Sequence, residues 1–118
     1  MSEDKKGRVV RDYLNDILEN IKDINVFIAD IDYGDLKSDK KTQYAVIRCL
    51  EVIGEAAKKI PDKSRIKYPV IPWQEISGMR DKLIHDYFGI DMETVWDTIQ
   101  EDLLPLKKAV ESLLEELA

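Results

Sequence analysis

The sequence predicts an all-α protein, an up-and-down antiparallel bundle of four main helices with a short extra helical turn near residues 62–67. Of its 118 residues, 44% are hydrophobic and 36% are charged, with only 5 glycines and 4 prolines. This composition is typical of packed helices with solvated outer faces. Apolar residues recur every three or four positions through most of the chain, which is the spacing of a helix face. A chain of this length forms one domain, predicted to span residues 1–118.

The first predicted helix covers about residues 9–28. Its apolar stripe advances by three or four residues and leaves the charged side chains on the other faces. The stripe consists of Val9, Val10, Tyr13, Leu14, Ile17, Leu18, Ile21, Ile24, Phe27 and Ile28. Residues 30–35 then hold one glycine and three aspartates, which favour turns over helix interiors. We expect a loop there.

A second helix is predicted from about Lys40, and Pro61 ends it because proline cannot continue the helical hydrogen bonds. Its stripe is formed by Tyr44, Ile47, Leu50, Ile53, Ala57 and Ile60. The small residues Gly54, Ala56 and Ala57 make one face of this helix thin. They are expected to let another helix approach closely, rather than to bind a ligand.

Two further helices complete the predicted bundle. The third begins near Trp73, runs through Ile76, Met79, Leu83 and Tyr87, and stops at Gly89, since glycine readily caps a helix. The fourth begins at about Met92 after the N-cap Asp91 and continues to Leu117. Pro105 is expected to bend it by removing one backbone hydrogen bond.

The composition also limits the environment and the kind of site. A single cysteine, Cys49, and an N-terminus without an apolar run point to the reducing cytoplasm. No apolar stretch approaches the roughly 18 residues of a membrane span. The net charge of −6 argues against non-specific binding of nucleic acid and requires any such chemistry to use a local site. One histidine and scattered carboxylates offer no recognisable set of metal ligands.

Two residues of the third helix do not follow the ordinary pattern. Arg80 falls in the middle of the apolar stripe, where an unpaired charge is unfavourable. It is therefore expected to pair with Glu55 or Glu51 of the second helix, to meet a partner chain, or to bind an anion such as phosphate. His85, the only histidine, lies five residues later, about 140° around the helix. It is either an ordinary surface residue or a proton-transfer group, for which imidazole is well suited near neutral pH.

The region that contains these residues resembles a known family. Residues 73–91, WQEISGMRDKLIHDYFGID, are similar to the signature region of HepT-like ribonuclease toxins of the HEPN group, with the pattern R-x4-H-x-Y on Arg80, His85 and Tyr87. Residues 53–56 (IGEA), 95–96 (VW) and 102–106 (DLLPL) also resemble the family pattern. The resemblance therefore covers most of the chain and implies a HEPN-like bundle.

The resemblance implies a metal-independent endoribonuclease toxin of a type II/VII-like toxin–antitoxin pair, acting as a homodimer without a cofactor. Arg80 and His85 would be its catalytic pair. Tyr87 would receive AMP from ATP, transferred by a nucleotidyltransferase antitoxin of the MntA type, which silences the nuclease. Many HEPN proteins carry asparagine after the arginine, whereas this chain has Asp81. A carboxylate there would repel RNA phosphate or pair with Arg80, and so weaken catalysis.

Acid–base cleavage of RNA gives a physical reason for a dimer. The 2′-hydroxyl needs a base, the leaving 5′-oxygen needs an acid, and one histidine cannot easily serve as both. A two-fold axis near the ends of the third helices would bring two copies of His85 and of Arg80 into one cleft. Because the 2′-hydroxyl is required, RNA and not DNA is the expected substrate.

Three alternatives stay open from the residues alone. The basic stretch formed by Lys58, Lys59, Lys63, Arg65 and Lys67 either guides RNA to the cleft or is a solvated helix end. Tyr87 is either the modified residue or a core aromatic. The whole chain is either a ribonuclease or a non-catalytic dimeric helical module that binds a nucleotidyltransferase.

Overall fold

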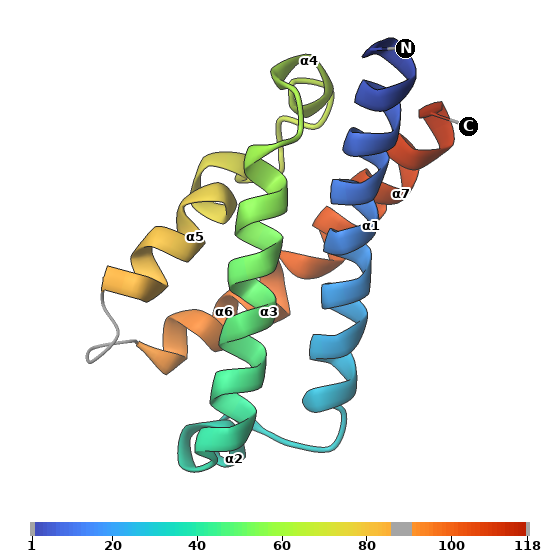
Figure 1. Cartoon of the computed structure of the whole chain (residues 1–118). Coiled ribbons are helices and arrows are strands. Elements are labelled where there is room, and N and C mark those ends of the chain that lie inside the picture. The colour runs from blue at the N-terminus through green and yellow to red at the C-terminus, as the bar shows by residue number, and fades with distance from the viewer. Residues whose placement is uncertain (1, 86–90, 118) are drawn as a thin grey trace.

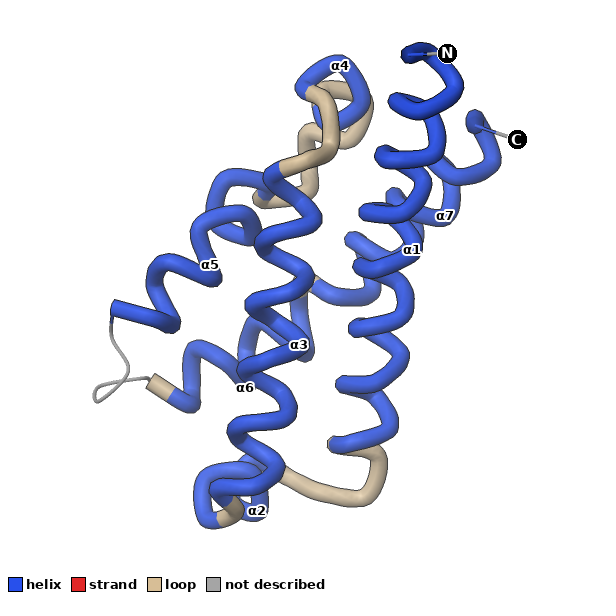
Figure 2. The backbone as a smooth tube through the Cα atoms, in the orientation of Figure 1, coloured by secondary structure: helices blue, strands red, loops and turns tan. Residues whose placement is uncertain are grey.

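A computed structural model describes the backbone of residues 2–85 and 91–117 and the side chains of residues 10–79 and 91–117. Within these ranges the chain is helical and has no strand (Figures 1 and 2). The helices are α1 (Ser2–Phe27), α2 (Tyr33–Ser38), α3 (Lys40–Lys58), α4 (Asp62–Arg65), α5 (Trp73–His85), α6 (Met92–Glu101) and α7 (Leu103–Leu117). The all-α prediction is confirmed, and α4 is the predicted short turn.

The long helices run alternately up and down around the central helix α3 (Figure 1). Helix α3 packs against α1 on one side and α5 on the other, and α1 also packs against α7. Their apolar faces form a single buried cluster, to which every helix except α4 contributes. This arrangement is the up-and-down bundle that the hydrophobic spacing predicts.

Helix α1 buries the predicted stripe through Leu14, Ile17, Ile21 and Ile24. The helix begins at Ser2, earlier than predicted. Phe27 was assigned to the stripe but is 42% exposed. It is the last residue of the helix and lies at the end of the stripe.

The predicted loop at residues 30–35 is wrong in its second half, because α2 begins at Tyr33. Its aspartates start a helix instead of a turn. The Asp32 carboxylate accepts a hydrogen bond from the Asp35 backbone N–H at 2.8 Å, and the Asp35 carboxylate accepts one from the Asp32 N–H at 3.1 Å. This reciprocal capping box satisfies two helix-end donors, and the buried Leu36 anchors the short helix.

Helix α3 begins where predicted, after the N-cap Asp39, and ends at Lys58, before the buried Ile60 and Pro61. The stripe residues from Leu50 onwards are buried, but Tyr44 is 54% exposed, so its assignment to the stripe is wrong. Gly54, Ala56 and Ala57 are all buried. Their burial supports the expected close packing, since α3 has helices on two sides.

The start of the fourth helix is confirmed, but its course is not. The Asp91 carboxylate accepts from the Glu93 N–H at 3.0 Å and the Thr94 N–H at 3.4 Å. The predicted single bent helix is two helices, α6 and α7, separated at Asp102. Pro105 clashes with the carbonyl of residue 101 in a continuous helix, so the break precedes it. Pro105 then lies in the first turn of α7, where its missing N–H is harmless.

In the described part of the chain, no helix is both long enough and apolar enough to cross a membrane.

Asp102 lies at the break, beside a small apolar cavity. The cavity measures about 10 Å³ and is also lined by Ile53 of α3 and by Ile76 and Met79 of α5. Burial raises the pKa of the Asp102 carboxyl above its ordinary value of 3.8, and the nearby charges of Glu101 and Glu75 raise it further. The charged form of Asp102 is therefore less favourable in the folded protein than in the unfolded chain.

We predict that Asp102→Asn increases the free energy of unfolding at neutral pH. The folded protein holds the Asp102 proton to a higher pH than the unfolded chain, so the wild type loses stability as the pH rises from about 3.8 through the raised pKa. Urea unfolding of the wild type and of Asp102→Asn from pH 3 to pH 7 gives the free energy of unfolding at each pH. The two values should converge at the acid end. The exposed Asp97→Asn is the control, and an Asp102→Asn variant less stable than it at pH 7 would contradict the prediction.

Candidate functional site

Helix α5 carries the predicted site, and its first two turns are firmly anchored. Trp73 is buried, and its indole Nε1 donates a hydrogen bond to the Tyr68 carbonyl at 3.0 Å. Ser77, also buried, donates from Oγ to the Trp73 carbonyl at 2.7 Å. Ile76 packs into the core between them. The Trp73 hydrogen bond ties the beginning of α5 to the preceding connection, and the buried Ile76 holds it against the core.

The predicted catalytic residues lie further along this helix. The backbone of Arg80 and His85 belongs to the last turns of α5, with His85 at its end. Five helical steps separate them by about 7.5 Å along the axis and about 140° around it. The side chains of Arg80, Asp81 and His85, and the whole of Tyr87, lie outside the described residues. The roles assigned to these four residues therefore stay predictions.

The apolar stripe around Arg80 can be followed only in its first half. Ile76 is 4% exposed, and Met79 is half-buried against the core. The side chain of Leu83, and the whole of Tyr87 and of the predicted stop at Gly89, lie outside the described residues. The part of the stripe that is described thus agrees with a helix face directed towards α3.

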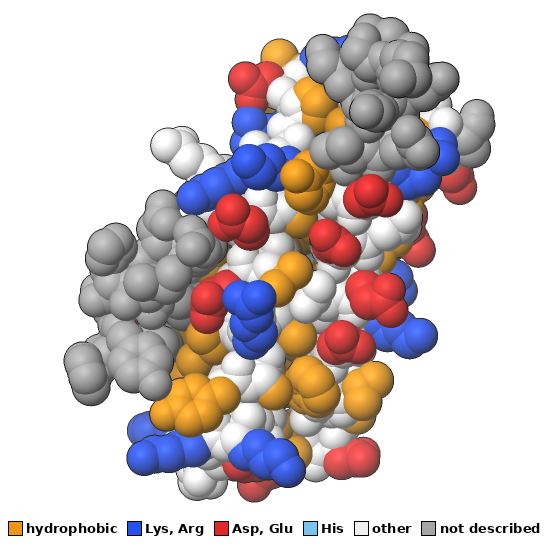
Figure 3. All heavy atoms as spheres, viewed as in Figure 1, with side chains coloured by type: hydrophobic (Ala, Val, Ile, Leu, Met, Phe, Trp, Pro, Cys, Tyr) orange, Lys and Arg blue, Asp and Glu red, His pale blue; other side chains and the backbone are white. Residues whose placement is uncertain are grey.

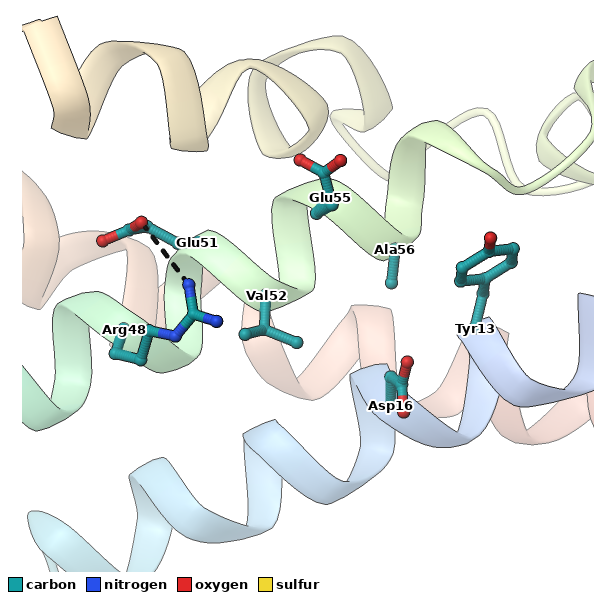
Figure 4. A pocket seen from close by; sticks show the side chains of 7 residues that line it. All are labelled: Tyr13, Asp16, Arg48, Glu51, Val52, Glu55 and Ala56. Carbon is teal, nitrogen blue, oxygen red and sulfur yellow. Dashed lines mark ion pairs between the residues drawn. The ribbon is translucent and has the colours of Figure 1, made fainter.

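Two carboxylates on α3 were predicted as alternative partners of Arg80. Glu51 is half-buried and pairs with Arg48 of the same helix, with Nη1 and Oε2 3.8 Å apart. Glu55 is exposed and points from α3 to the side of α5, whereas Val52 and Ala56 point to α1 (Figure 4). Glu55 is therefore the carboxylate of the two that is directed towards the helix of the motif.

These carboxylates line a groove of about 330 Å³ between α1 and α3 (Figure 4). Tyr13 and Asp16 of α1 and Arg48 of α3 contribute to the same groove. The sequence placed Tyr13 in the apolar stripe of the first helix and gave no site role to any of these three residues, and only the three-residue spacing of Arg48 and Glu51 could have indicated their pairing. With three carboxylates against one guanidinium, the groove repels phosphate. RNA is not expected to bind in it.

The predicted RNA-guiding stretch is divided by the structure. Lys59 and Lys63 are exposed, and Lys58 lies in the last turn of α3. Arg65 forms an ion pair with Asp62, and Lys67 forms one with Glu116 of α7, at 2.8 Å between Nζ and Oε1. The Glu116 carboxylate raises the pKa of the Lys67 ammonium. Two of the five predicted cations are thus already held by carboxylates.

The stretch also lies at the wrong end of α5 for a direct contact with His85 in the same chain. Residues 58–67 adjoin the beginning of α5, whereas His85 ends this helix (Figure 1). A helix of 13 residues spans about 20 Å. Any guidance of RNA from these lysines to His85 would have to act over that distance.

No group of three or more histidine, cysteine, aspartate or glutamate side chains in the described residues could hold a metal ion. Cys49 is buried in α3, and burial raises the pKa of its thiol. A raised pKa keeps this thiol protonated and unreactive.

Comparison with known proteins supplies the class to which this fold and motif belong. A family model described as ribonuclease HepT-like matches residues 17–113, which include α3, α5 and the whole R-x4-H-x-Y pattern. This match defines the protein as an endoribonuclease.

Relatives from archaea and bacteria agree with this class. A candidate RNase of Methanocaldococcus jannaschii is 51% identical over 110 residues, which cover 93% of this chain and 95% of that protein. A protein of Thermococcus cleftensis named as a ribonuclease HepT is 52% identical over 103 residues, covering 87% and 94%. A candidate RNase of Caldanaerobacter subterraneus is 40% identical over 105 residues, covering 89% and 94%. No solved structure matches the chain. The chain belongs to the ribonuclease HepT-like family.

Proposed function

We propose that the chain is a metal-independent ribonuclease toxin whose catalytic residues are Arg80 and His85. The observation that carries the proposal is the R-x4-H-x-Y pattern, with its arginine and histidine on the last turns of α5, in a member of the ribonuclease HepT-like family. The anchored beginning of α5 supports it, because a rigid helix holds the two residues at a fixed separation.

The proposed reaction uses the 2′-hydroxyl of RNA as the nucleophile. One imidazole removes the 2′-hydroxyl proton, the 2′-oxygen attacks phosphorus, and the bond from phosphorus to the 5′-oxygen breaks. A second imidazole, in its protonated form, donates a proton to the departing 5′-oxygen. The guanidinium of Arg80 stabilises the negative charge that develops on the phosphoryl oxygens. The products are a 2′,3′-cyclic phosphate and a 5′-hydroxyl.

We place this reaction at the interface of a homodimer, because each chain supplies only one histidine. A two-fold axis near the ends of the two α5 helices would bring both copies of His85 into one cleft. Gly78 supports this arrangement. It precedes His85 by seven residues, on the same face of α5, and among the described residues no atom beyond this stretch of α5 lies within 4 Å of the position that a Cβ would take. A second chain can therefore approach the backbone of α5 closely at Gly78.

The acidic character of the chain sets the conditions for substrate binding. The groove between α1 and α3 repels phosphate, and Asp81 follows Arg80 directly in the sequence. Lys59 and Lys63 are exposed and could attract RNA over a distance. We therefore expect weak binding of RNA with only a shallow dependence on salt, because few cations contact phosphate, and specificity for RNA arises at the 2′-hydroxyl.

Tyr87 is the proposed site of control. A nucleotidyltransferase antitoxin of the MntA type would transfer AMP from ATP to its hydroxyl. The tyrosine oxygen attacks the α-phosphorus of ATP, pyrophosphate leaves, and a tyrosine–AMP phosphodiester forms. Tyr87 follows His85 by two residues. A bulky, negatively charged nucleotide at that position would exclude an RNA phosphate from the cleft.

We predict that His85→Ala lowers the rate of RNA cleavage by a factor on the order of 10² to 10⁴, because it removes the proposed acid and base. Arg80→Ala should lower it by on the order of 10² to 10³, through the loss of charge stabilisation on phosphorus. Cleavage of a labelled RNA under single-turnover conditions measures both. Gln74→Ala, an exposed position on the same helix, should cleave like the wild type.

The same assay contains two further controls. EDTA should leave wild-type cleavage unchanged, and an RNA with a 2′-deoxy sugar at the cleaved position should stay intact. If the wild type and both variants leave RNA equally intact while the dimer persists, the chain is a binding module and the proposal fails.

A mixed dimer tests whether the two histidines share one cleft. Dimers with one wild-type chain and one His85→Ala chain can be isolated through two different affinity tags. Independent sites would give about half of the wild-type activity, whereas a shared cleft should give far less than half. Mixed dimers with Gln74→Ala should keep full activity. Half-activity with His85→Ala would refute the shared cleft but not the catalytic role of His85.

We also predict that incubation with ATP and a nucleotidyltransferase encoded beside this chain adds the mass of one or more AMP groups and abolishes RNA cleavage. Intact-protein mass spectrometry with peptide mapping should place the first group on Tyr87. Tyr87→Phe should stay active after the same treatment. An AMP group found elsewhere, with Tyr87→Phe still silenced, would rule Tyr87 out as the control site.

A further inference from the structure

A second groove, distinct from the motif on α5, lies between α1 and α7. It has a volume of about 460 Å³, and its apolar wall includes Leu18, Ile21 and Val26 of α1 and Ala29 of the turn that follows α1. Val26 is 66% exposed. Leu104, one helical turn before the lining residue Lys107, is 57% exposed. Contiguous apolar surface that is left in contact with water commonly marks an interaction site.

The charges beside this groove differ from those of the chain as a whole. Lys22 of α1 and Lys107 of α7 line it, with Glu111 as the acidic residue among the lining side chains. The chain carries a net charge of −6, so two lysines against one glutamate are a local exception. The groove therefore favours an occupant that is apolar in the middle and acidic at its edges.

The acidic residues of α1 follow another face of this helix. Asp12, Asp16, Glu19 and Asp23 recur at steps of three and four residues, and Asp16 lines the groove next to α3. Figure 3 shows acidic side chains gathered over α1 on the face turned to the viewer. None of these four carboxylates lines the groove between α1 and α7. One side of α1 is thus acidic, whereas the side next to α7 carries lysines and would attract acidic groups.

The shape of the groove restricts the occupant to one kind of structure. A groove between two helices accepts a third helix, whose apolar residues at i, i+3 or i+4, and i+7 enter it. A second copy of this chain fits poorly, because two-fold pairing of the groove with itself would bring four lysines together against two glutamates. RNA fits poorly too, since its phosphates gain nothing from an apolar wall.

We propose that this groove docks an amphipathic helix of a partner protein, with acidic residues on both sides of its apolar stripe. The proposal does not depend on the ribonuclease chemistry. No described residue of α5 lines the groove, so a helix bound there leaves the motif on α5 open to RNA.

Two synthetic peptides test the proposal on the full chain. Both have about 20 residues, enough for a helix, and the same leucine stripe. One carries glutamates beside the stripe and the other carries lysines. Fluorescence anisotropy of the labelled peptides should show that the glutamate peptide binds about tenfold more tightly, a difference of about 1.4 kcal/mol.

Variants of the protein assign the preference to the groove. Lys22→Glu combined with Lys107→Glu should reverse it, so that the lysine peptide binds more tightly. Val26→Asp should weaken the binding of both peptides, and its high exposure makes it safe for folding. Lys40→Glu combined with Lys108→Glu changes the net charge equally at exposed positions that do not line the groove, and should behave like the wild type. Circular dichroism confirms the fold of each variant.

Several results would overturn the proposal. The proposal is wrong if neither peptide binds, if both bind equally, or if the lysine variants keep the wild-type preference. Sedimentation of the protein without peptide tests whether a second copy of this chain occupies the groove instead. If Val26→Asp alone breaks an oligomer into smaller species, a second copy of this chain occupies the groove and the partner-helix proposal is wrong.

Discussion

The fold depends on the close packing of α3 against helices on both of its sides. Helix α1 contacts one side and α5 the other, and the buried small residues Gly54, Ala56 and Ala57 reduce the thickness of α3 between them. A larger side chain at any of these positions would force a flanking helix outwards, because packed cores have little free volume. Since α5 carries the R-x4-H pattern, the packing of α3 also sets the position of Arg80 and His85.

Acidic and basic side chains of this protein gather at different grooves. Carboxylates gather in the groove between α1 and α3, and lysines lie beside the groove between α1 and α7. An acidic ribonuclease cannot attract RNA through its overall charge, so it has to rely on a few local cations. Of the cations in the basic stretch, Arg65 pairs with Asp62 within α4, and Lys67 of the connection to α5 pairs with Glu116 of α7. These two cations are therefore partly neutralised.

Much of the fold could be predicted from the sequence, because helical periodicity is a local signal. The stripes of α1, α3, α6 and α7 and the N-cap Asp91 were found where the spacing placed them, apart from the exposed Phe27, Tyr44 and Leu117 near the helix ends. The capping box of α2 was missed because aspartate favours turns and helix starts alike. The break at Asp102 was misplaced because the effect of Pro105 reaches back to the carbonyl of residue 101.

The site was harder to predict from the sequence than the fold. The ion pair of Lys67 with Glu116 joins residues 49 positions apart, a contact that no local pattern reveals. Periodicity identified Arg80 as a charge on an apolar face, but it could not choose between Glu55, Glu51 and phosphate. In the structure Glu51 pairs with Arg48 and Glu55 is exposed, and the choice of a partner for Arg80 stays a prediction. The roles of Arg80, His85 and Tyr87 rest on the motif and on family membership.

The first and last helices meet at one end of the bundle, away from the motif of α5. The guanidinium of Arg11 donates a hydrogen bond to the carbonyl of Leu117 at 2.8 Å, and Figure 1 shows the first and last helices adjoining at the end of the bundle remote from His85. A short linker could therefore join α7 to α1, and a circular permutant opened between α1 and α2 would keep every long helix intact. A fluorescent protein or affinity handle fused beyond either end would project away from the motif of α5 and leave it accessible.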